Sequence, residues 1–327
     1  MKNLSEIRQE LSSVLRQSED FRLEKAAAYK KGVIITIIAI IVGLICLGLG
    51  TLGYVLFYVV GIISIVGALI IFALTSSKRQ KEYKTHFKSN VLKRIVESMM
   101  PTVSYQGERC IDRTDFNRAQ IFSSNFNIYN GEDYFKGVYK GIGFEMSELD
   151  VKRRTQSTSY SNGQSRTNTN TTQIFKGLFM IITANKNSYG ETYVLPDTAE
   201  KLFGSFGKFI QKNLGSLAQN GSMIYLENHP EFEKRFVVYT TEEIEAERLL
   251  SQSLLESMLD IFERWKITPS FAFIQNKVYV AIPFSRDMMK VSLHKSLIDN
   301  QEEILKQFMD EIALSMSIVD ELSDNLK

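Results

Sequence analysis

The feature that most constrains this chain is an uncharged run of 46 residues, from Gly32 to Ser77. An α-helix rises about 1.5 Å per residue, so one helix through the run would be roughly 69 Å long, over twice the ~30 Å hydrocarbon core of a bilayer. Two membrane-length helices fit better, at 33–49 and 54–74. The glycine-rich segment 48–53 suits a reversal of the chain, so the sequence predicts a transmembrane helical hairpin over residues 32–77.

Basic side chains flank this run on both sides, and the turn between the two helices carries no charge. The flanking cations are Lys25, Lys30, Lys31, Lys78, Arg79, Lys81 and Lys84. Because basic flanks stay on the cytoplasmic side, the sequence predicts a multi-pass protein of the plasma membrane with both termini in the cytoplasm. Ala39 with Gly43, and Ser64 with Ala68, are pairs of small residues that would let the helices approach closely.

Other interpretations of the run fit less well. A signal peptide is disfavoured because a long charged segment precedes Gly32 and no small-residue cleavage site follows. The length of the uncharged run disfavours a buried hairpin of a soluble protein. Gly48, Gly50 and Gly53 spell the GxGxxG pattern of dinucleotide sites, but that pattern needs a preceding strand and an acidic residue about 20 positions later. The first acidic residue after these glycines is Glu82, which is too far along the chain, so the glycines predict a turn.

Two amphipathic segments lie at the ends of the chain. In residues 1–31, the apolar positions at helical spacing are Leu4, Ile7, Leu11, Val14 and Phe21. They predict either a coiled coil between two copies or a helix packed on its own domain. In residues 291–327, the apolar stripe is Leu305, Phe308, Ile312, Val319 and Leu322. That helix could complete the core or bind a partner.

Between these ends, residues 78–101 predict a basic juxtamembrane helix that stops at Pro101. Its cations could contact anionic lipid head groups or could only set the topology. Residues 102–290 predict a cytoplasmic α+β domain with a mainly antiparallel sheet and flanking helices. The apolar stretch 174–182 is typical of a central strand, and residues 271–282 predict a hairpin that turns near Gln275.

Three local predictions concern this domain. The alternation of apolar residues changes parity near Ser147 and Glu148, which indicates a β-bulge there. The segment 155–172 consists almost entirely of Ser, Thr, Asn, Gln and Arg, so we expect a long mobile hairpin loop. Asp197 is placed to cap a helix whose apolar face begins at Ala199.

Residues with catalytic potential are few. Cys46 lies in the apolar run and Cys110 far from it, so we expect no disulfide between them. The three histidines, His86, His229 and His294, are isolated from each other and from cysteine pairs. The pattern therefore predicts no metal site. Cys110 could act as a nucleophile only if a histidine such as His229 came near it in space.

Carboxylates cluster at Glu132–Asp133, at Glu231 and Glu233, and at 242–247. Such pairs can carry out acid–base chemistry when their pKa values differ, although acids at a helix start usually complement its dipole. The chain has no Walker or GxSxG motif. The sequence thus predicts no catalytic, cofactor-binding or metal-binding residue. Net charge is +2, which gives no long-range attraction for nucleic acid.

An ordered set of phrases between Tyr129 and Arg248 carries a resemblance to a known family. The phrases are Tyr129–Tyr134 with Gly137, Phe144 with Ser147–Glu148, Phe175–Phe179, Val194–Asp197 with Ala199–Glu200, Phe203–Gly204, Pro230–Lys234, Phe236–Tyr239 and Glu245–Arg248. In this order the chain resembles a bacterial family of membrane proteins that carries a domain-of-unknown-function label, number 3137. The resemblance implies two N-terminal transmembrane helices, a cytoplasmic α+β domain and the bacterial inner membrane. It supplies no reaction.

Three hypotheses for function follow. The first is a non-enzymatic, membrane-anchored cytoplasmic module for protein interaction or regulation, with a protein partner or a second copy of the chain. The resemblance implies a LemA-like membrane protein as one such partner, because family members are often encoded beside one. The second is a membrane-tethered enzyme that uses Cys110 or the carboxylates. The third is a sensor of anionic lipid or membrane stress that acts through residues 78–94.

Overall fold

The computed structural model describes residues 4–52, 55–122, 125–161, 164–197, 221–226 and 228–326. The chain divides into two compact units. The first unit comprises Met1–Ser98 and Lys290–Phe308, and the second comprises Met99–Met289 and Met309–Lys327. Helix α11, Gln301–Leu326, contributes residues to both.

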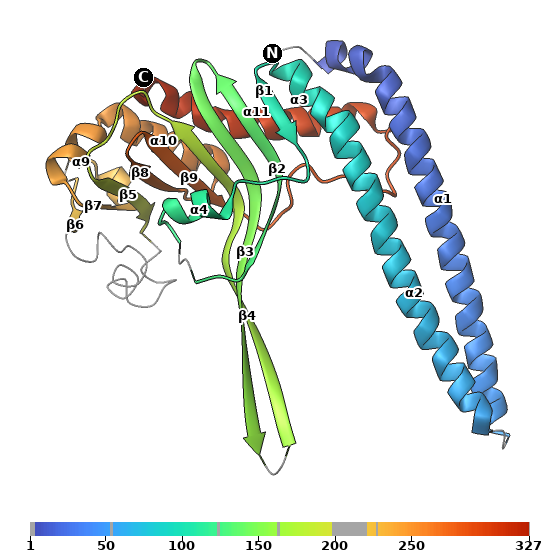
Figure 1. The fold of residues 1–327 in the computed structure, drawn as a ribbon. Coiled ribbons are helices and arrows are strands. Elements are labelled where there is room, and N and C mark those ends of the chain that lie inside the picture. Colours follow the sequence, from blue (N-terminus) through green and yellow to red (C-terminus); the bar gives the residue numbers. More distant parts are fainter. Residues whose placement is uncertain are drawn as a thin grey trace. The chain divides into compact units, whose positions relative to one another are not determined.

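Two long helices form the first unit. Helix α1 runs from Leu4 to Gly50, and α2 runs from Val55 to Phe87 beside it (Figure 1). A short π-helical turn, Lys88–Leu92, leads from α2 into α3, Lys93–Met99. Residues 4–31 and the first apolar span are therefore one continuous helix. At the reversal, the Thr51 backbone N–H donates to the Gly48 carbonyl over 3.2 Å.

The apolar parts of α1 and α2 are exposed almost everywhere except where the two helices touch. Only 6% of the most apolar 18-residue stretch of each is buried, which is unlike a core helix of a soluble protein. A Cβ added at Gly61 would lie 2.7 Å from the Gly43 carbonyl oxygen, so only glycine permits this approach. The Ser64 hydroxyl donates to the Ala39 carbonyl over 3.2 Å. The predicted small residues Ala39, Gly43 and Ser64 thus lie at the helix contact, and Gly61 completes it.

The part of α1 that precedes the apolar run buries much of its apolar stripe within its own unit. Ile7, Leu11 and Leu15 are at most 1% exposed. The Ser98 hydroxyl donates to the Glu10 carboxylate over 2.8 Å. Of the two alternatives for residues 1–31, packing on the same chain is therefore the one observed.

The second unit is built on an antiparallel sheet whose strands are ordered β1-β2-β3-β4-β9-β8-β5-β7-β6. The strands are β1 Val103–Gln106, β2 Ile128–Tyr139, β3 Ile142–Ser161, β4 Gln164–Thr183, β5 Glu191–Pro196, β6 Ser222–Ile224, β7 Phe236–Thr240, β8 Ser270–Ile274 and β9 Lys277–Pro283. Among the described residues, the helices of this unit are α4 Arg113–Arg118, α8 Pro230–Glu233, α9 Glu243–Leu249, α10 Gln252–Trp265 and the later part of α11. The predicted α+β class is confirmed.

Helices lie on both faces of this sheet. Helix α4 lies in front of the strands in Figure 1, and α10 and α11 lie behind them. On the α4 side, Phe116 packs between aromatic rings, with its centroid 5.1 Å from that of Phe179 and 5.6 Å from that of Phe126. On α11, the apolar stripe predicted from the sequence is at most 1% exposed, so the helix packs on its own chain.

Several local predictions differ from the structure. The segment predicted as a loop at 155–172 instead continues β3 and β4, whose pairing extends to Ser161 opposite Gln164. The prediction of a hairpin is confirmed. The prediction of a mobile loop is wrong, because the backbone N–H and C=O groups of the two strands pair with each other along the β-ladder. The bulge lies in β2, after Glu132, opposite the predicted position in β3. The helix expected after Asp197 falls outside the described residues.

Candidate binding site

Cys110 follows β1 and packs against the apolar cluster on the α4 side of the sheet. Burial raises the pKa of its thiol, Asp112 raises it further, and Arg109 opposes both. A nucleophilic cysteine needs the opposite shift, because the thiolate is the reactive form. His229 precedes α8, where its carbonyl accepts the Phe232 N–H over 3.0 Å. Among the described residues, no hydrogen bond or ring contact joins this histidine to Cys110.

The other two histidines belong to the first unit. The His86 ring stacks on Phe21 with a centroid distance of 4.1 Å, and His294 meets Tyr29 edge-on at 4.9 Å. The acids at Glu231 and Glu245 form surface ion pairs with Lys234 and Arg248. These predicted candidates are therefore not brought together.

The carboxylates at Glu132–Asp133 do meet a third one. The β-bulge in β2 gives Asp133 a left-handed backbone, with φ of +59°, and brings it beside Glu148 on β3. Oxygen atoms of Glu132, Asp133 and Glu148 lie within 4.8 Å of one another. The Tyr105 hydroxyl donates to Asp133, and the Met288 N–H donates to Glu148 over 2.9 Å.

This acidic cluster holds a proton near neutral pH. Burial raises the pKa of Glu148 to about 7, and the charges of Glu132, Asp133 and Asp287 add to the rise, while the Met288 N–H opposes it. Asp133 and Glu148 are 4% and 7% exposed, so the two charges share a poorly solvated space. The arrangement can store a proton between neighbouring carboxylates.

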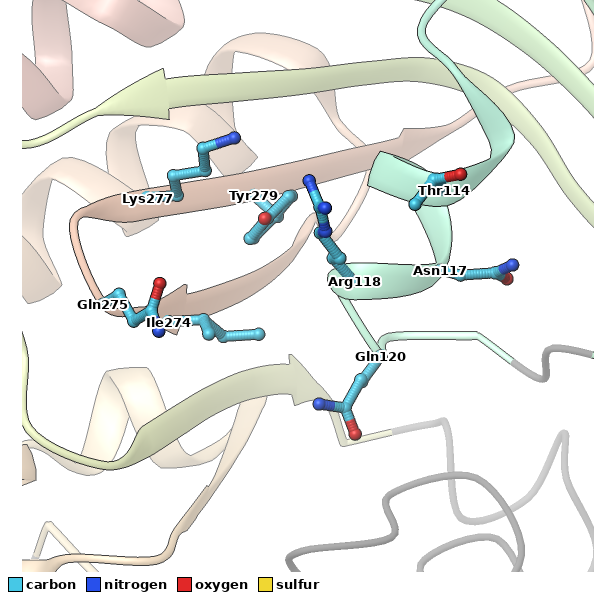
Figure 2. A pocket seen from close by; sticks show the side chains of 8 residues that line it. All are labelled: Thr114, Asn117, Arg118, Gln120, Ile274, Gln275, Lys277 and Tyr279. Carbon is cyan, nitrogen blue, oxygen red and sulfur yellow. The ribbon is translucent and has the colours of Figure 1, made fainter.

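A separate cleft of about 520 Å³ opens on the α4 side of the sheet (Figure 2). Most of the residues that line it are polar, and two of them are cations. The lining residues are Thr114, Asn117, Arg118, Gln120, Ile274, Gln275, Lys277 and Tyr279. We call this the α4–β9 cleft. Its volume falls in the range of small-molecule sites, about 300–1,000 Å³.

The fold explains why these side chains meet. Helix α4 is held over the sheet by Phe116, so its last turn carries Arg118 to the end of the β8–β9 hairpin. The hairpin turns at Gln275, whose φ is +56°. Lys277 and Tyr279 lie two positions apart on β9, so both point to the α4 side. Figure 2 shows Tyr279 between Lys277 and Arg118.

Charges of both signs surround the cleft. Arg118 donates to the Asp115 carboxylate over 2.8 Å, and the Gln120 amide donates to Glu191 over 3.2 Å. Burial raises the pKa of Tyr279 to about 12, with a further rise from Asp115 and a decrease from Arg118. The Tyr279 ring is 2% exposed and packs near Phe179, with centroids 6.3 Å apart.

No pattern in the sequence predicts this cleft. Its two walls come from residues 114–120 and 274–279, which are far apart in the chain. The only local signal is the alternation of Lys277 and Tyr279 in a strand, which predicts a shared face but not what lies opposite. In the sequence, Glu148 is marked only by the parity change and by its place in a family phrase, because its acidic neighbours lie on another strand.

Comparisons with known proteins bear on the family and little else. No curated protein matches the chain. The chain is similar to the crystal structure of the mycobacterial trehalose monomycolate transport factor A, TtfA, with 12% sequence identity and a TM-score of 0.32, over 68% of this chain and 92% of that chain. A similarity this weak carries no conclusion about fold or function. A family described as "Protein of unknown function (DUF3137)" matches residues 173–324. This match over residues 173–324 confirms the family resemblance inferred from the sequence.

Proposed function

We propose that the protein is a non-enzymatic module, anchored in the bacterial plasma membrane by α1 and α2, whose second unit binds a protein partner in the cytoplasm. The anchor is supported by apolar side chains that stay exposed along both helices, such as Ile35 at 66% and Leu56 at 73%. Exposed apolar surface on this scale is typical of membrane contact. The basic flanks support cytoplasmic termini.

The terminal helices do not offer the partner an apolar surface. The stripes on the cytoplasmic part of α1 and on α11 are both buried within the chain. Interaction through those stripes would require them to leave their own core. The partner surface is therefore sought on the second unit.

The observation that carries the proposal is the outer part of the β3–β4 hairpin, residues 155–161 and 164–172, which we call the β3–β4 arm. Strand β2 pairs with β3 only as far as Lys152, and β9 pairs with β4 only from Gly177. Beyond these points, no further described strand pairs with either edge. Figure 1 shows the arm extending from the sheet as a two-stranded ribbon.

Such a ribbon is marginally stable in water unless something packs on it or extends it. Its free edges present unpaired N–H and C=O groups, which are the template for adding a strand from another protein. The segment 151–172 contains no Asp or Glu and carries Lys152, Arg153, Arg154 and Arg166. Charge complementarity therefore favours an acidic partner segment that extends the arm.

Site-specific photocrosslinking in intact cells tests this proposal. A photoreactive amino acid at Ser157, in the arm, should give a discrete crosslinked product of higher mass. The same amino acid at Ile244, which is 86% exposed on α9, is the matched control in the same unit. Reversing the charges with Arg154→Glu and Arg166→Glu should abolish the Ser157 product, whereas Arg286→Glu should leave it. Equal crosslinking at Ser157 and Ile244 would contradict the proposal.

The anchor is tested separately by thiol labelling. In a chain with Cys46 and Cys110 replaced by serine, Thr51→Cys should react with a membrane-impermeant maleimide in intact cells. Ser89→Cys should react only after the cells are opened. Labelling of Ser89→Cys in intact cells would overturn the topology and the cytoplasmic location of the partner, but would leave the arm as the proposed binding surface.

A second candidate function is contact with anionic lipid, supported by a shallow cleft between α1 and α2. The cleft measures about 600 Å³ and includes Lys25, Lys78 and Lys81. Lys78 is the first residue after the apolar run, where lipid phosphates lie. Reconstitution into nanodiscs should enrich phosphatidylglycerol around the wild type but not around Lys78→Gln with Lys81→Gln. Enrichment that does not fall with salt would count against this electrostatic contact.

A further inference from the structure

Tyr279 is the only large polar side chain in the α4–β9 cleft that is almost completely buried, and its hydroxyl has no hydrogen bond to another described residue. Other buried tyrosines of the same unit are satisfied. Tyr193 donates to Glu191 over 2.9 Å, and Tyr105 donates to Asp133. The Tyr279 ring is buried, but its hydroxyl oxygen remains accessible from the cleft that the residue lines. Water or a ligand in that space can therefore accept its hydrogen bond.

Two cations frame this hydroxyl from different elements. Arg118 stands at the end of α4 and Lys277 at the start of β9 (Figure 2). The Asp115 carboxylate pairs with Arg118, but the arginine side chain in that pair is 62% exposed. An exposed pair of this kind contributes little, so it can be exchanged for a ligand that also reaches Lys277.

The donor groups of the cleft are those that bind an oxyanion. A guanidinium presents paired N–H groups, an ammonium adds a point charge, and a phenol adds one strong donor. The amide groups of Asn117 and Gln275 and the hydroxyl of Thr114 line the same space. Ile274 provides an apolar wall, and a volume of about 520 Å³ exceeds what one phosphate or carboxylate group fills. An organic part of the ligand would occupy the remainder.

We propose that the α4–β9 cleft binds a small organic oxyanion, with its phosphate or carboxylate group held by Arg118, Lys277 and the Tyr279 hydroxyl. This site is independent of the β3–β4 arm and of the membrane anchor. The second unit would then bind a small molecule as well as its proposed protein partner.

Equilibrium dialysis of the full chain in detergent tests the site. The probes are inorganic phosphate, glycerol 3-phosphate and succinate, each up to 10 mM. At least one probe should bind saturably with one site per chain. An organic phosphate that binds more tightly than succinate assigns the phosphate form, and the reverse order assigns the carboxylate form.

Three variants separate the cleft from general electrostatics. Arg118→Gln with Lys277→Gln should weaken binding at least a hundredfold, because both charge-assisted contacts are lost. Arg286→Gln with Lys290→Gln removes the same charge from exposed positions outside the cleft and should leave binding unchanged. Tyr279→Phe keeps the ring and removes one donor, so binding should fall about tenfold.

Tyr279→Phe also distinguishes a ligand donor from a structural one. If the hydroxyl serves a ligand, this variant should unfold at the same temperature as the wild type, or higher, without a probe. A lower unfolding temperature would reveal a partner within the protein and would overturn the assignment. Saturable binding of no probe, or binding that all three variants retain, would likewise overturn the site.

Discussion

Each unit of this protein buries a glutamate that accepts a backbone N–H, and the two glutamates titrate in opposite directions. In the first unit, Glu19 accepts the Leu297 N–H over 2.8 Å, and a hydrogen bond from Arg22 lowers the pKa of Glu19. In the second unit, Glu148 accepts the Met288 N–H over 2.9 Å, and burial raises its pKa to about 7. The two carboxylates are 8% and 7% exposed.

The difference shows that burial does not by itself decide the charge of a carboxylate. Glu19 receives two hydrogen bonds from the guanidinium of Arg22, over 2.7 and 2.9 Å, and a third from the Ser296 hydroxyl. Glu148 faces other acids instead. A neighbouring cation outweighs burial and makes the first site a fixed ion pair. In the second site burial, reinforced by neighbouring anions, makes Glu148 a place where a proton is held.

The largest expected effect comes from removing the cation of the first site. Arg22→Met should destabilise the contact between α1 and the segment 293–297 by about 3–5 kcal/mol, because Glu19 is left as a buried, uncompensated charge. Hydrogen exchange at the Leu297 amide, measured by mass spectrometry on the full chain in detergent, should accelerate accordingly.

The double variant Glu19→Met with Arg22→Met is the matched control for this prediction. Replacing both charges by apolar side chains removes the uncompensated carboxylate, so most of the lost stability should return. Protection of Leu297 that is as poor in the double variant as in Arg22→Met would mean that packing, and not charge, distinguishes this site.

The next effect should come from Glu148, and it depends on pH. A carboxyl whose pKa is raised by folding contributes stability below its ordinary value of 4.5 and loses it as the pH rises through about 7. The shift corresponds to about 3 kcal/mol. Glu148→Gln keeps an acceptor for Met288 but cannot ionise, so it should raise stability at pH 8 by up to this amount and change little at pH 5.

Unfolding temperatures of wild type and Glu148→Gln, measured at half-unit steps between pH 5 and pH 8, check this prediction. The two curves should separate as the pH rises. Glu19→Gln provides the opposite control, because a lowered pKa contributes stability that is lost as the pH falls. A constant difference between wild type and Glu148→Gln across the range would show that Glu148 is ionised throughout.

The sequence predicted those parts of the molecule that depend on one local pattern. The length of the uncharged run required two helices, and the apolar stripe on α11 matched its buried face. On α1 the match is partial, because Ile7 and Leu11 are buried but the rest of the predicted stripe is half-buried. The turn at Gln275 was also predicted, because it separates two alternating apolar stretches. Each of these features is determined by a sequence pattern that spans only a few turns of helix or a few residues of strand.

Features that depend on pairing between distant segments were missed. The composition of 155–172 cannot support a hydrophobic core. However, β3 and β4 begin inside the sheet and continue outward through this segment. The many threonines of the segment favour an extended backbone. The acidic cluster needs the bulge of β2 opposite β3, and the α4–β9 cleft needs α4 against β9. No spacing along one strand reveals which side chain will stand opposite.

The smallest expected effect tests how the proton is shared within the acidic cluster. The Tyr105 hydroxyl donates to Asp133, and the charge of Asp133 raises the pKa of Glu148. Tyr105→Phe removes that donor, which should cost about 1–2 kcal/mol and make Asp133 harder to ionise. With less negative charge beside it, Glu148 should release its proton at a lower pH, so the midpoint of the pH-dependent unfolding temperature should move down. Tyr193→Phe, which removes a buried hydroxyl from Glu191 elsewhere in the sheet, should destabilise similarly without moving that midpoint. An unmoved midpoint in Tyr105→Phe would show that Glu148 titrates independently of Asp133, and the contrast with Glu19 would then rest on desolvation alone.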